Sequence, residues 1–457
     1  MTSTEAIRVL APSGMLGAGF PPESIDRGIE LGADVIALDA GSTDSGPYYL
    51  GSGTPKTTAA AVARDLRILL RAAAGAGIPL IVGSCGTSGT DSGVDWVAGI
   101  AGTILREEGL SLKVARVYSE QRADALKERL NEGRVHPLPP MGDLDAATLD
   151  GCTHIVGMMG HEPIVAALAA GADVVLAGRA TDTALAAAYP LMKGLPAGPA
   201  WHAAKIVECG GQCTTNPRSG GVLATVDHGG FTIEPLDPAV ACTPTSVAAH
   251  MLYETVDPYR MREPAGTLVV DEATYTALDD RRVRVEGSRF EPAPHTIKLE
   301  GARVTGYETM SFTAIRDPLI LGDIDAWLAL LHEVLTARVR QTLGLDPDAY
   351  VVDIRPYGYN AVLGDLDPSS APPREVGVML LVNAPDQATA TAIAKVANPL
   401  MLHLPTPGMD YLPSLAFPTS PAETERGPAY AFVLNHVVAV DDPTEMFRIE
   451  LLEGVSR

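Results

Sequence analysis

The sequence predicts an α/β fold, in which a parallel-sheet domain over residues 1–220 precedes a smaller α+β domain over residues 221–457. Short apolar runs alternate with helix-forming runs in the first half. This alternation is typical of βαβ units that form a parallel sheet with helices on both faces. After about Gly220 the strand patterns become longer and more polar, which indicates a second architecture.

The elements of the first half follow one another in a regular order. Each apolar run leads into a loop rich in Gly, Ser, Thr and Asp, and then into a helix pattern. Right-handed crossovers place such loops on one edge of the sheet, where ligands bind. The predicted strands are residues 7–10, 34–39, 79–83, 112–118, 153–158 and 173–177, and the predicted helices start near Glu23 and cover 58–74 and 161–170.

The second half reads as a β–β–α pattern, which predicts helices on one face of a mixed sheet. A proline-rich stretch, residues 365–374, predicts an exposed loop. The predicted strands are residues 267–270, 281–286, 350–354 and 376–382, and the predicted helices are 323–343 and 386–397.

Composition excludes several classes of function. The chain has 457 residues with 34 basic and 56 acidic side chains, which gives a formal charge of −22. No basic stripe is present for nucleic acid or for an anionic membrane surface. No apolar segment of about 18 residues predicts a membrane span. Residues 1–5 lack the pattern of a signal peptide, so we expect a cytoplasmic protein.

The cysteines favour a reducing compartment. The chain has five of them, an odd and sparse set that does not suggest a disulfide framework. Cys209 and Cys213 form a CxxxC spacing without a second pair of ligands nearby, so no zinc site is expected there. Cys209 is either a nucleophile activated by a cation or a buried, inert thiol.

The most informative run is residues 178–182, where an apolar strand ends on Gly, Arg, Ala, Thr and Asp. Arg179 and Thr181 are predicted to bind a substrate carboxylate or carbonyl, and Asp182 to act as a general acid or base. The structural alternative is that Asp182 caps the next helix and Arg179 pairs with it. Both roles can coexist.

Two further loops, residues 41–46 and 84–93, are expected on the same edge of the sheet. Their glycines and hydroxyls can hold a phosphate or a carboxylate, although tight turns need the same residues. Neither loop has the spacing of a dinucleotide or nucleotide motif. Asp44, with Asp39 near it, is a further candidate acid or base. The candidate substrate-binding residues here are Ser42, Thr43, Tyr48, Gly86 and Ser88.

Other polar residues are weaker candidates. His161 opens a helix and is either its cap, a base or a substrate-binding residue. Glu208 is a candidate proton carrier beside Cys209. His161, Asp182, His202 and Glu208 together lack any metal-binding spacing, so no metal is expected. The segments 354–361, 425–430 and 434–436 either make interdomain contacts that complete a cleft or form ordinary packing contacts and turns.

Several runs together resemble the acyclic terpene utilisation AtuA family. The resemblance implies catabolism of branched terpenoid or other carboxylic acids as CoA esters. It also implies a partner, since some members work with a small α+β subunit of roughly a hundred residues, the usual size of one domain. The matching runs are residues 13–20, 32–44, 46–53, 178–182, 204–210, 373–377, 426–428 and 435–438.

These observations lead to an expected lyase, a hydratase/dehydratase or related isomerase, acting on a carboxylate or an acyl-CoA. Such chemistry needs positioned acid/base groups and an anion site, so no cofactor is expected apart from CoA as part of the substrate. A homo-oligomer is expected. Two alternatives remain, a non-catalytic subunit that binds acyl-CoA or scaffolds a small partner, and a metal-assisted carbon–carbon lyase.

Overall fold

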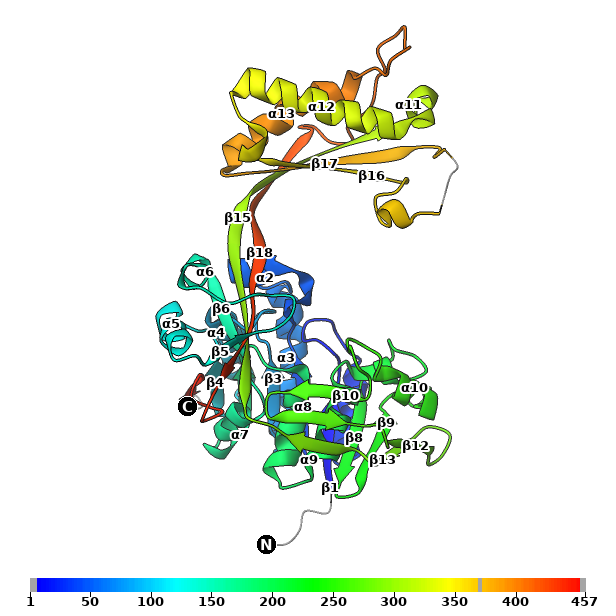
Figure 1. Ribbon diagram of the computed structural model, residues 1–457. Helices are drawn as coiled ribbons and strands as arrows, with labels where there is room; N and C mark the ends of the chain where they lie inside the picture. The colour runs from blue at the N-terminus through cyan, green and yellow to red at the C-terminus, as the bar shows by residue number, and fades with distance from the viewer. Residues whose placement is uncertain (1–5, 369–371, 453–457) are drawn as a thin grey trace. The chain divides into compact units, whose positions relative to one another are not determined.

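The computed structural model describes residues 6–368 and 372–452. The chain divides into two compact units, Met1–Arg303 with Phe432–Arg457, and Val304–Ala431 (Figure 1). This division differs from the predicted boundary after residue 220, because strands from 222–286 join the first sheet. Residues 1–5 and 369–371, on which the signal-peptide expectation and part of the loop prediction rest, lie outside the described residues.

The first unit contains the predicted parallel sheet as the centre of a larger mixed sheet. The central order is β1-β2-β3-β7-β4, and each of these neighbours pairs in parallel. Parallel βαβ elements are therefore present, as the alternating apolar runs predicted. These strands are β1 (Ala6–Ala11), β2 (Val35–Asp39), β3 (Leu80–Gly83), β7 (Val174–Ala177) and β4 (Val114–Tyr118).

Antiparallel strands extend both edges of that sheet. On one side, β8 pairs with β1, and the order continues outward through β9, β13 and β12. The β8–β9 turn forms because Asp227 Oδ1 accepts from the backbone N–H groups of Gly229 (2.8 Å) and Gly230 (3.0 Å). The strands are β8 (Val222–Asp227), β9 (Gly230–Pro235), β12 (Thr274–Ala277) and β13 (Val283–Glu286), with β19 (Arg448–Leu452) pairing with β4 on the other edge.

Helices cover both faces of the central sheet, because successive strand residues point to opposite sides. Val35 and Ala37 belong to one apolar cluster, whereas Ile36 and Leu38 belong to the other. The first cluster contains α7 (Glu162–Ala169), α8 (Asp182–Met192) and α9 (Ala197–Val207), and the second contains α1 (Pro22–Glu30), α3 (Ala59–Ala76) and α4 (Asp91–Glu108).

The remaining elements of this unit are short. The predicted strand 153–158 forms β6 (His154–Met158), but it pairs with β15 rather than joining the central sheet. A small antiparallel sheet has the order β10-β11-β14. These elements are α2 (Pro47–Ser52), α5 (Ala123–Asn131), α6 (Ala146–Gly151), α10 (Pro244–His250), β5 (Val135–Pro137), β10 (Arg260–Glu263), β11 (Gly266–Val269) and β14 (Arg289–Pro292), with short 3₁₀ turns at Thr43–Ser45 and Gly210–Cys213.

The second unit is an antiparallel sheet with helices packed on it. Buried residues of β17, α12 and α13 form one apolar cluster, in agreement with the alternating pattern of β17. Its elements are β16 (Val351–Tyr357), β17 (Val376–Ala384), α11 (Pro318–Gly322), α12 (Ile324–Leu343), α13 (Gln387–His403), 3₁₀ turns at Pro347–Ala349 and Gly364–Leu366, and the long strands β15 (Thr296–Ile315) and β18 (Glu423–Ala439), each of which belongs partly to either unit.

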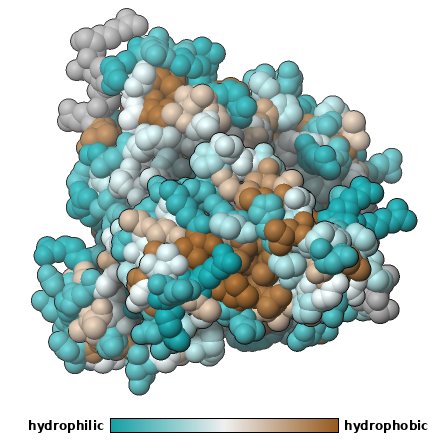
Figure 2. All heavy atoms as spheres, turned by 90° about the horizontal axis from the view of Figure 1, so that it is seen from above, coloured by the Kyte–Doolittle hydropathy of each residue, from teal (hydrophilic) through white to brown (hydrophobic). Residues whose placement is uncertain are grey.

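The surface is mixed in polarity. Large apolar side chains stay exposed at Val256, Val362 and Leu366. In the view from above, apolar side chains gather near the middle of the visible face and hydrophilic ones border them (Figure 2). Within the described ranges, every helix is too short or too polar to cross a membrane.

Candidate functional site

The loops after β2, β3 and β7 pack tightly against one another. A Cβ on Gly41 would lie 2.6 Å from the Cα of Thr87, and one on Gly89 would lie 2.1 Å from the backbone N of Arg179. These positions therefore need glycine for close approach. Ser84 and Thr87 adopt positive φ angles of 43° and 84°, which marks local backbone strain of the kind that collects at functional sites.

Arg179 is buried and already paired. Its Nε donates to Glu300 Oε2 at 2.9 Å and its Nη1 to Ser84 Oγ at 3.3 Å. Its Nη1 also lies 3.7 Å from Asp182 Oδ1. Because these carboxylates balance its charge, the structural role that the sequence left open for Arg179 is the one that the contacts support.

Glu300 was not predicted from the sequence as a site residue, yet it forms the buried ion pair with Arg179. Lys298 Nζ lies 3.1 Å from Glu300 Oε1, and Thr43 Oγ1 donates to Glu300 Oε2 at 3.1 Å. Burial opposes the ionisation of Glu300, but Arg179 and Lys298 outweigh it and lower the pKa of this carboxyl to about 2. Thr43, predicted to bind substrate, instead supports the ion pair.

Asp182 is the first residue of α8 and half-buried. The helix cap is Thr181, whose side chain accepts from the Ala184 N–H at 3.2 Å, so the alternative that Asp182 is the cap is wrong. Burial raises the pKa of Asp182; the Arg179 charge opposes this shift and the charge of Asp44 adds to it.

Asp39 lies close to Asp182 and Arg179. Burial raises the pKa of Asp39 well above its ordinary value, and the charge of Asp182 raises it further. Its Oδ1 is buried and, within the described parts of the chain, has no hydrogen-bond partner. Two carboxyl groups held this close favour one bound proton, as in acid/base pairs.

The segment 42–48, which includes the start of α2, brings Asp44 near Asp182. Ser42 Oγ donates to Asp44 Oδ2 at 3.0 Å and accepts from the Asp44 N–H at 3.2 Å, which fixes the turn. Tyr48 is exposed and its ring meets that of Tyr49 edge-on, with centroids 5.5 Å apart. The loop thus presents a carboxylate and a phenol at the same edge as α8.

Gly86 and Ser88 are buried inside their loop. Ser88 Oγ donates to the Tyr49 carbonyl at 3.2 Å. A Cβ on Gly86 would lie 2.3 Å from the Cα of Gly93. The hydrogen bond holds the loop to α2, and the close packing leaves no room for a side chain at Gly86.

His161 occupies the N-cap position of α7 but makes no side-chain cap hydrogen bond. Its ring packs edge-on against Trp201, and its Nδ1 lies 3.3 Å from Glu162 Oε1. Burial lowers the pKa of His161 to about 4 and raises that of Glu162 to about 7.

His202 is also buried. Its ring nitrogens are hydrogen-bonded to Ser288 (2.7 Å) and Tyr275 (3.2 Å), so neither nitrogen is free for a metal.

Glu208 and Cys209 follow the end of α9. Lys205 Nζ pairs with Glu208 Oε1 and donates to the Tyr253 carbonyl at 3.0 Å. Burial raises the pKa of Glu208 to about 8. Burial and then the Glu208 charge raise the pKa of the Cys209 thiol, which is the opposite of the activation a nucleophile needs.

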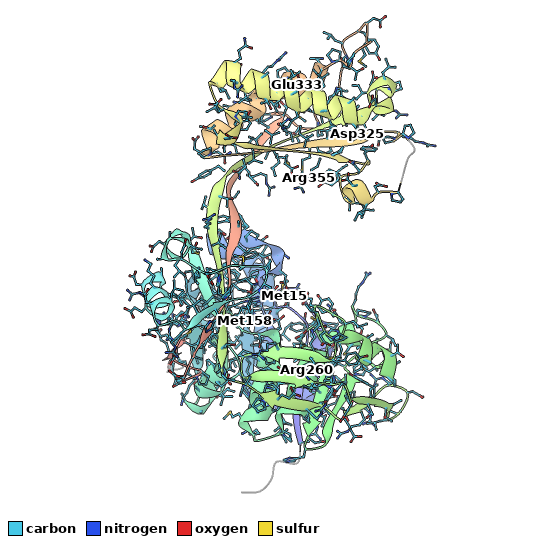
Figure 3. All side chains as sticks on the ribbon, in the orientation of Figure 1. Met15, Met158, Arg260, Asp325, Glu333 and Arg355 are labelled. Carbon is cyan, nitrogen blue, oxygen red and sulfur yellow. The ribbon has the colours of Figure 1, made fainter. Side chains whose placement is uncertain are left out.

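A cavity of about 410 Å³ lies beside the N-terminus of α8, where Thr181 lines it. Glu263 lies in its wall and accepts from Thr183 (2.9 Å) and Thr181 (3.4 Å), and burial raises the pKa of Glu263 to about 8. Met158, labelled in Figure 3, contributes to the apolar side. The lining residues are Leu138, Pro139, Met158, Thr181, Arg262, Glu263, Pro264, Thr296, Lys298, Asn435 and Val437.

Comparison with protein-family models gives one finding. The model of the acyclic terpene utilisation family protein AtuA matches residues 51–426. The chain belongs to the AtuA family. The resemblance seen in the sequence is thereby confirmed. No curated protein and no solved structure gives a match.

In this AtuA-family chain, the late polar segments 354–361 and 434–436 belong to different units. Asn435 lines the cavity, whereas Arg355 pairs with Asp353 at 2.6 Å in the second unit. Tyr359 Oη there donates to Asp325 at 2.8 Å; Arg355 and Asp325 are labelled in Figure 3.

Sequence reasoning missed Glu263, Lys298 and Glu300. Lys298 and Glu300 are alternate residues of β15 and share one face of the strand, a pattern visible in the sequence. Glu300 pairs with Arg179, which lies 121 positions earlier, and Glu263 accepts from Thr181, which lies 82 positions earlier, so only the fold shows the site.

Glu263 makes the stability of the protein pH-dependent. Its pKa is about 8 in the folded state against an ordinary value of 4.5, so its contribution is full below pH 4.5 and is lost as the pH rises through 8. Glu263→Gln keeps a neutral side chain. From about pH 5 to about pH 8, wild type is expected to lose stability relative to this variant in urea unfolding. If the difference in unfolding free energy between wild type and Glu263→Gln were equal at both pH values, Glu263 would be ionised at both, contrary to its raised pKa.

Proposed function

We propose that the chain catalyses the addition or removal of water, or a related isomerisation, on a branched carboxylic acid or its CoA thioester in terpenoid catabolism. The observation that supports this best is the cavity, in which an apolar wall, cationic side chains and a buried carboxyl meet beside the α8 N-terminus. Each part matches one requirement of such a substrate.

The cations suit an anionic group or a polarised carbonyl. Lys298 and Arg262 both line the cavity. Lys298 already pairs with Glu300, so Arg262, which bonds only weakly to Thr267 Oγ1 (3.4 Å), is the better candidate to hold a carboxylate or a phosphate of CoA. Leu138, Met158 and Val437 offer the apolar surface that a branched hydrocarbon chain would cover.

The carboxyl groups suit proton transfer. In the elimination, a carboxylate removes the proton at the carbon next to the carbonyl, the C–O bond at the following carbon breaks, and a protonated carboxyl gives its proton to the leaving hydroxide, so that water and a C=C bond form. Asp182, Asp44 and Glu263 are the candidates for these two roles. Lys298 stabilises the negative charge that develops on the carbonyl oxygen. The steps need no redox cofactor.

Arg262 provides a direct test of the binding mode. Arg262→Met is expected to raise KM by about 10-fold or more with little change in kcat, because a charge-assisted hydrogen bond of about 1.5–3 kcal/mol is lost in ground and transition states alike. The matched control is Arg260→Met on the same strand, labelled in Figure 3, which pairs with Glu291 outside the cavity.

The assay uses branched 3-hydroxyacyl-CoA thioesters, the free acids and their unsaturated products. An unchanged KM in Arg262→Met would contradict the proposed binding mode. Tight binding of a thioester without turnover would instead favour a non-catalytic acyl-CoA-binding subunit, and addition of a small α+β partner protein tests whether the chain needs one.

A further inference from the structure

Three side chains of different donor chemistry converge beside Asp182. Glu208 follows α9, Cys209 follows Glu208, and His250 is the last residue of α10. A carboxylate oxygen, the thiol sulfur and an imidazole nitrogen from these residues all lie within 4.8 Å of one another. The elements that carry them are far apart in the sequence, and α10 packs against the 3₁₀ turn that follows Cys209.

His250 gives the independent evidence for a ligand. Its side chain is buried, with only 5 % of the residue exposed. The ring hydrogen-bonds the backbone of Lys205, while Nε2 is buried and has no hydrogen-bond partner among residues 6–368 and 372–452. A histidine that binds a metal is typically held in this way, with its other ring nitrogen on a backbone carbonyl. An unpaired buried acceptor is otherwise costly.

The side chains that act electrostatically on this cluster include more carboxyl groups than cations. Asp182 and Glu254 lie close enough to Cys209 to act on it electrostatically, and Lys205 is the cation that opposes them. Glu263 acts on Glu208 in the same sense. A bound divalent cation would favour the ionised form of these carboxyl groups. Lys205 contacts Glu208 through Oε1, and a carboxylate that binds metal through one oxygen can keep such a contact on the other.

The donor set selects the class of metal. Thiolate, imidazole and carboxylate together suit zinc and related transition metals, whereas magnesium and calcium prefer oxygen ligands alone. Three protein ligands are typical of sites that keep a fourth position open to water or substrate.

We propose that Glu208, Cys209 and His250 bind a zinc-type divalent transition metal ion beside Asp182. This assignment replaces the expectation that the chain uses no metal, and it gives Glu208 and Cys209 the role of ligands instead of proton carrier and nucleophile. It stands independently of the proposed reaction, because binding is measured without turnover.

The test is titration of the chelator-treated full chain with Co²⁺, followed by competition with Zn²⁺. We expect one Co²⁺ per chain and a thiolate-to-cobalt charge-transfer band that Zn²⁺ abolishes. Cys209→Ser should remove the band. His250→Ala should weaken binding by about 100-fold or more, since even the loss of a residue that only orients a ligand costs 10–100-fold.

Matched controls separate this site from other thiols and imidazoles. Cys152→Ser and His136→Ala, in the same unit but outside the cluster, should bind Co²⁺ as wild type does. If His250→Ala does not fold, as judged by circular dichroism, His250→Gln takes its place. Absence of the band in the wild type, or a band that persists in Cys209→Ser, would overturn the proposal.

Discussion

Asp182→Asn is expected to lower kcat by about 100- to 10,000-fold, the usual contribution of a general acid or base. The amide fills the same space at the start of α8, but it cannot exchange a proton. The helix keeps its cap because Thr181 provides it. The fold should therefore be retained, with a loss of stability from the weakened contact with Arg179. The measurement is kcat on the preferred substrate together with the urea midpoint.

Asp91→Asn is the matched control for this substitution. Asp91 is the first residue of α4, follows the capping Thr90, and lies near Arg448 rather than in the cavity. Asp91→Asn should therefore leave kcat nearly unchanged. Full activity in Asp182→Asn would exclude Asp182 as the proton-transfer group and leave only its interaction with Arg179.

Glu300→Gln is expected to destabilise the fold by about 3 kcal/mol or more, the typical cost of breaking a buried ion pair from one side. The side chains of Arg179 and Glu300 are 7 % and 8 % exposed, so Arg179 would keep a buried charge without its nearest carboxylate, and the more distant Asp182 and Asp39 would balance it less well. Because Glu300 has a lowered pKa of about 2, its stabilisation is present above its ordinary pKa of 4.5 and is lost as the pH falls through 2.

Urea unfolding at neutral pH measures this effect. Glu291→Gln is the control, since it removes the same group from the Arg260 pair, whose side chains are both 48 % exposed. An exposed pair contributes less than about 1 kcal/mol. Equal losses in the two variants would contradict the structural role given to Glu300.

The local parts of the fold were predictable from the sequence. The apolar runs at 34–39, 79–83 and 173–177 become the parallel strands β2, β3 and β7, because continuous apolar runs flanked by polar loops are typical of strands buried on both faces. The position of β8 was not predictable. It pairs antiparallel to β1, more than two hundred positions away, and this long-range pairing draws residues beyond 220 into the first sheet.

The sequence pointed to a position for the candidate site but left the roles of its residues open. The run at 178–182 follows β7, on the edge where the parallel strands of the central sheet end. The role of Arg179 depends on Glu300, and the setting of Cys209 depends on His250; neither partner is near in the sequence. The proposed ligands are spread over the segment after α9 and the end of α10, so they leave no short spacing motif in the sequence.

Incorporation of oxygen-18 tests the central claim most directly. The purified chain is incubated in ¹⁸O-labelled water with branched, α,β-unsaturated CoA thioesters and free acids, and the products are analysed by mass spectrometry. We predict a hydroxylated product that carries one ¹⁸O atom with the wild type and almost none with Asp182→Asn. Absence of labelled product from the wild type across this panel, with the metal-loaded chain and the small partner protein included, would contradict the proposed hydration chemistry.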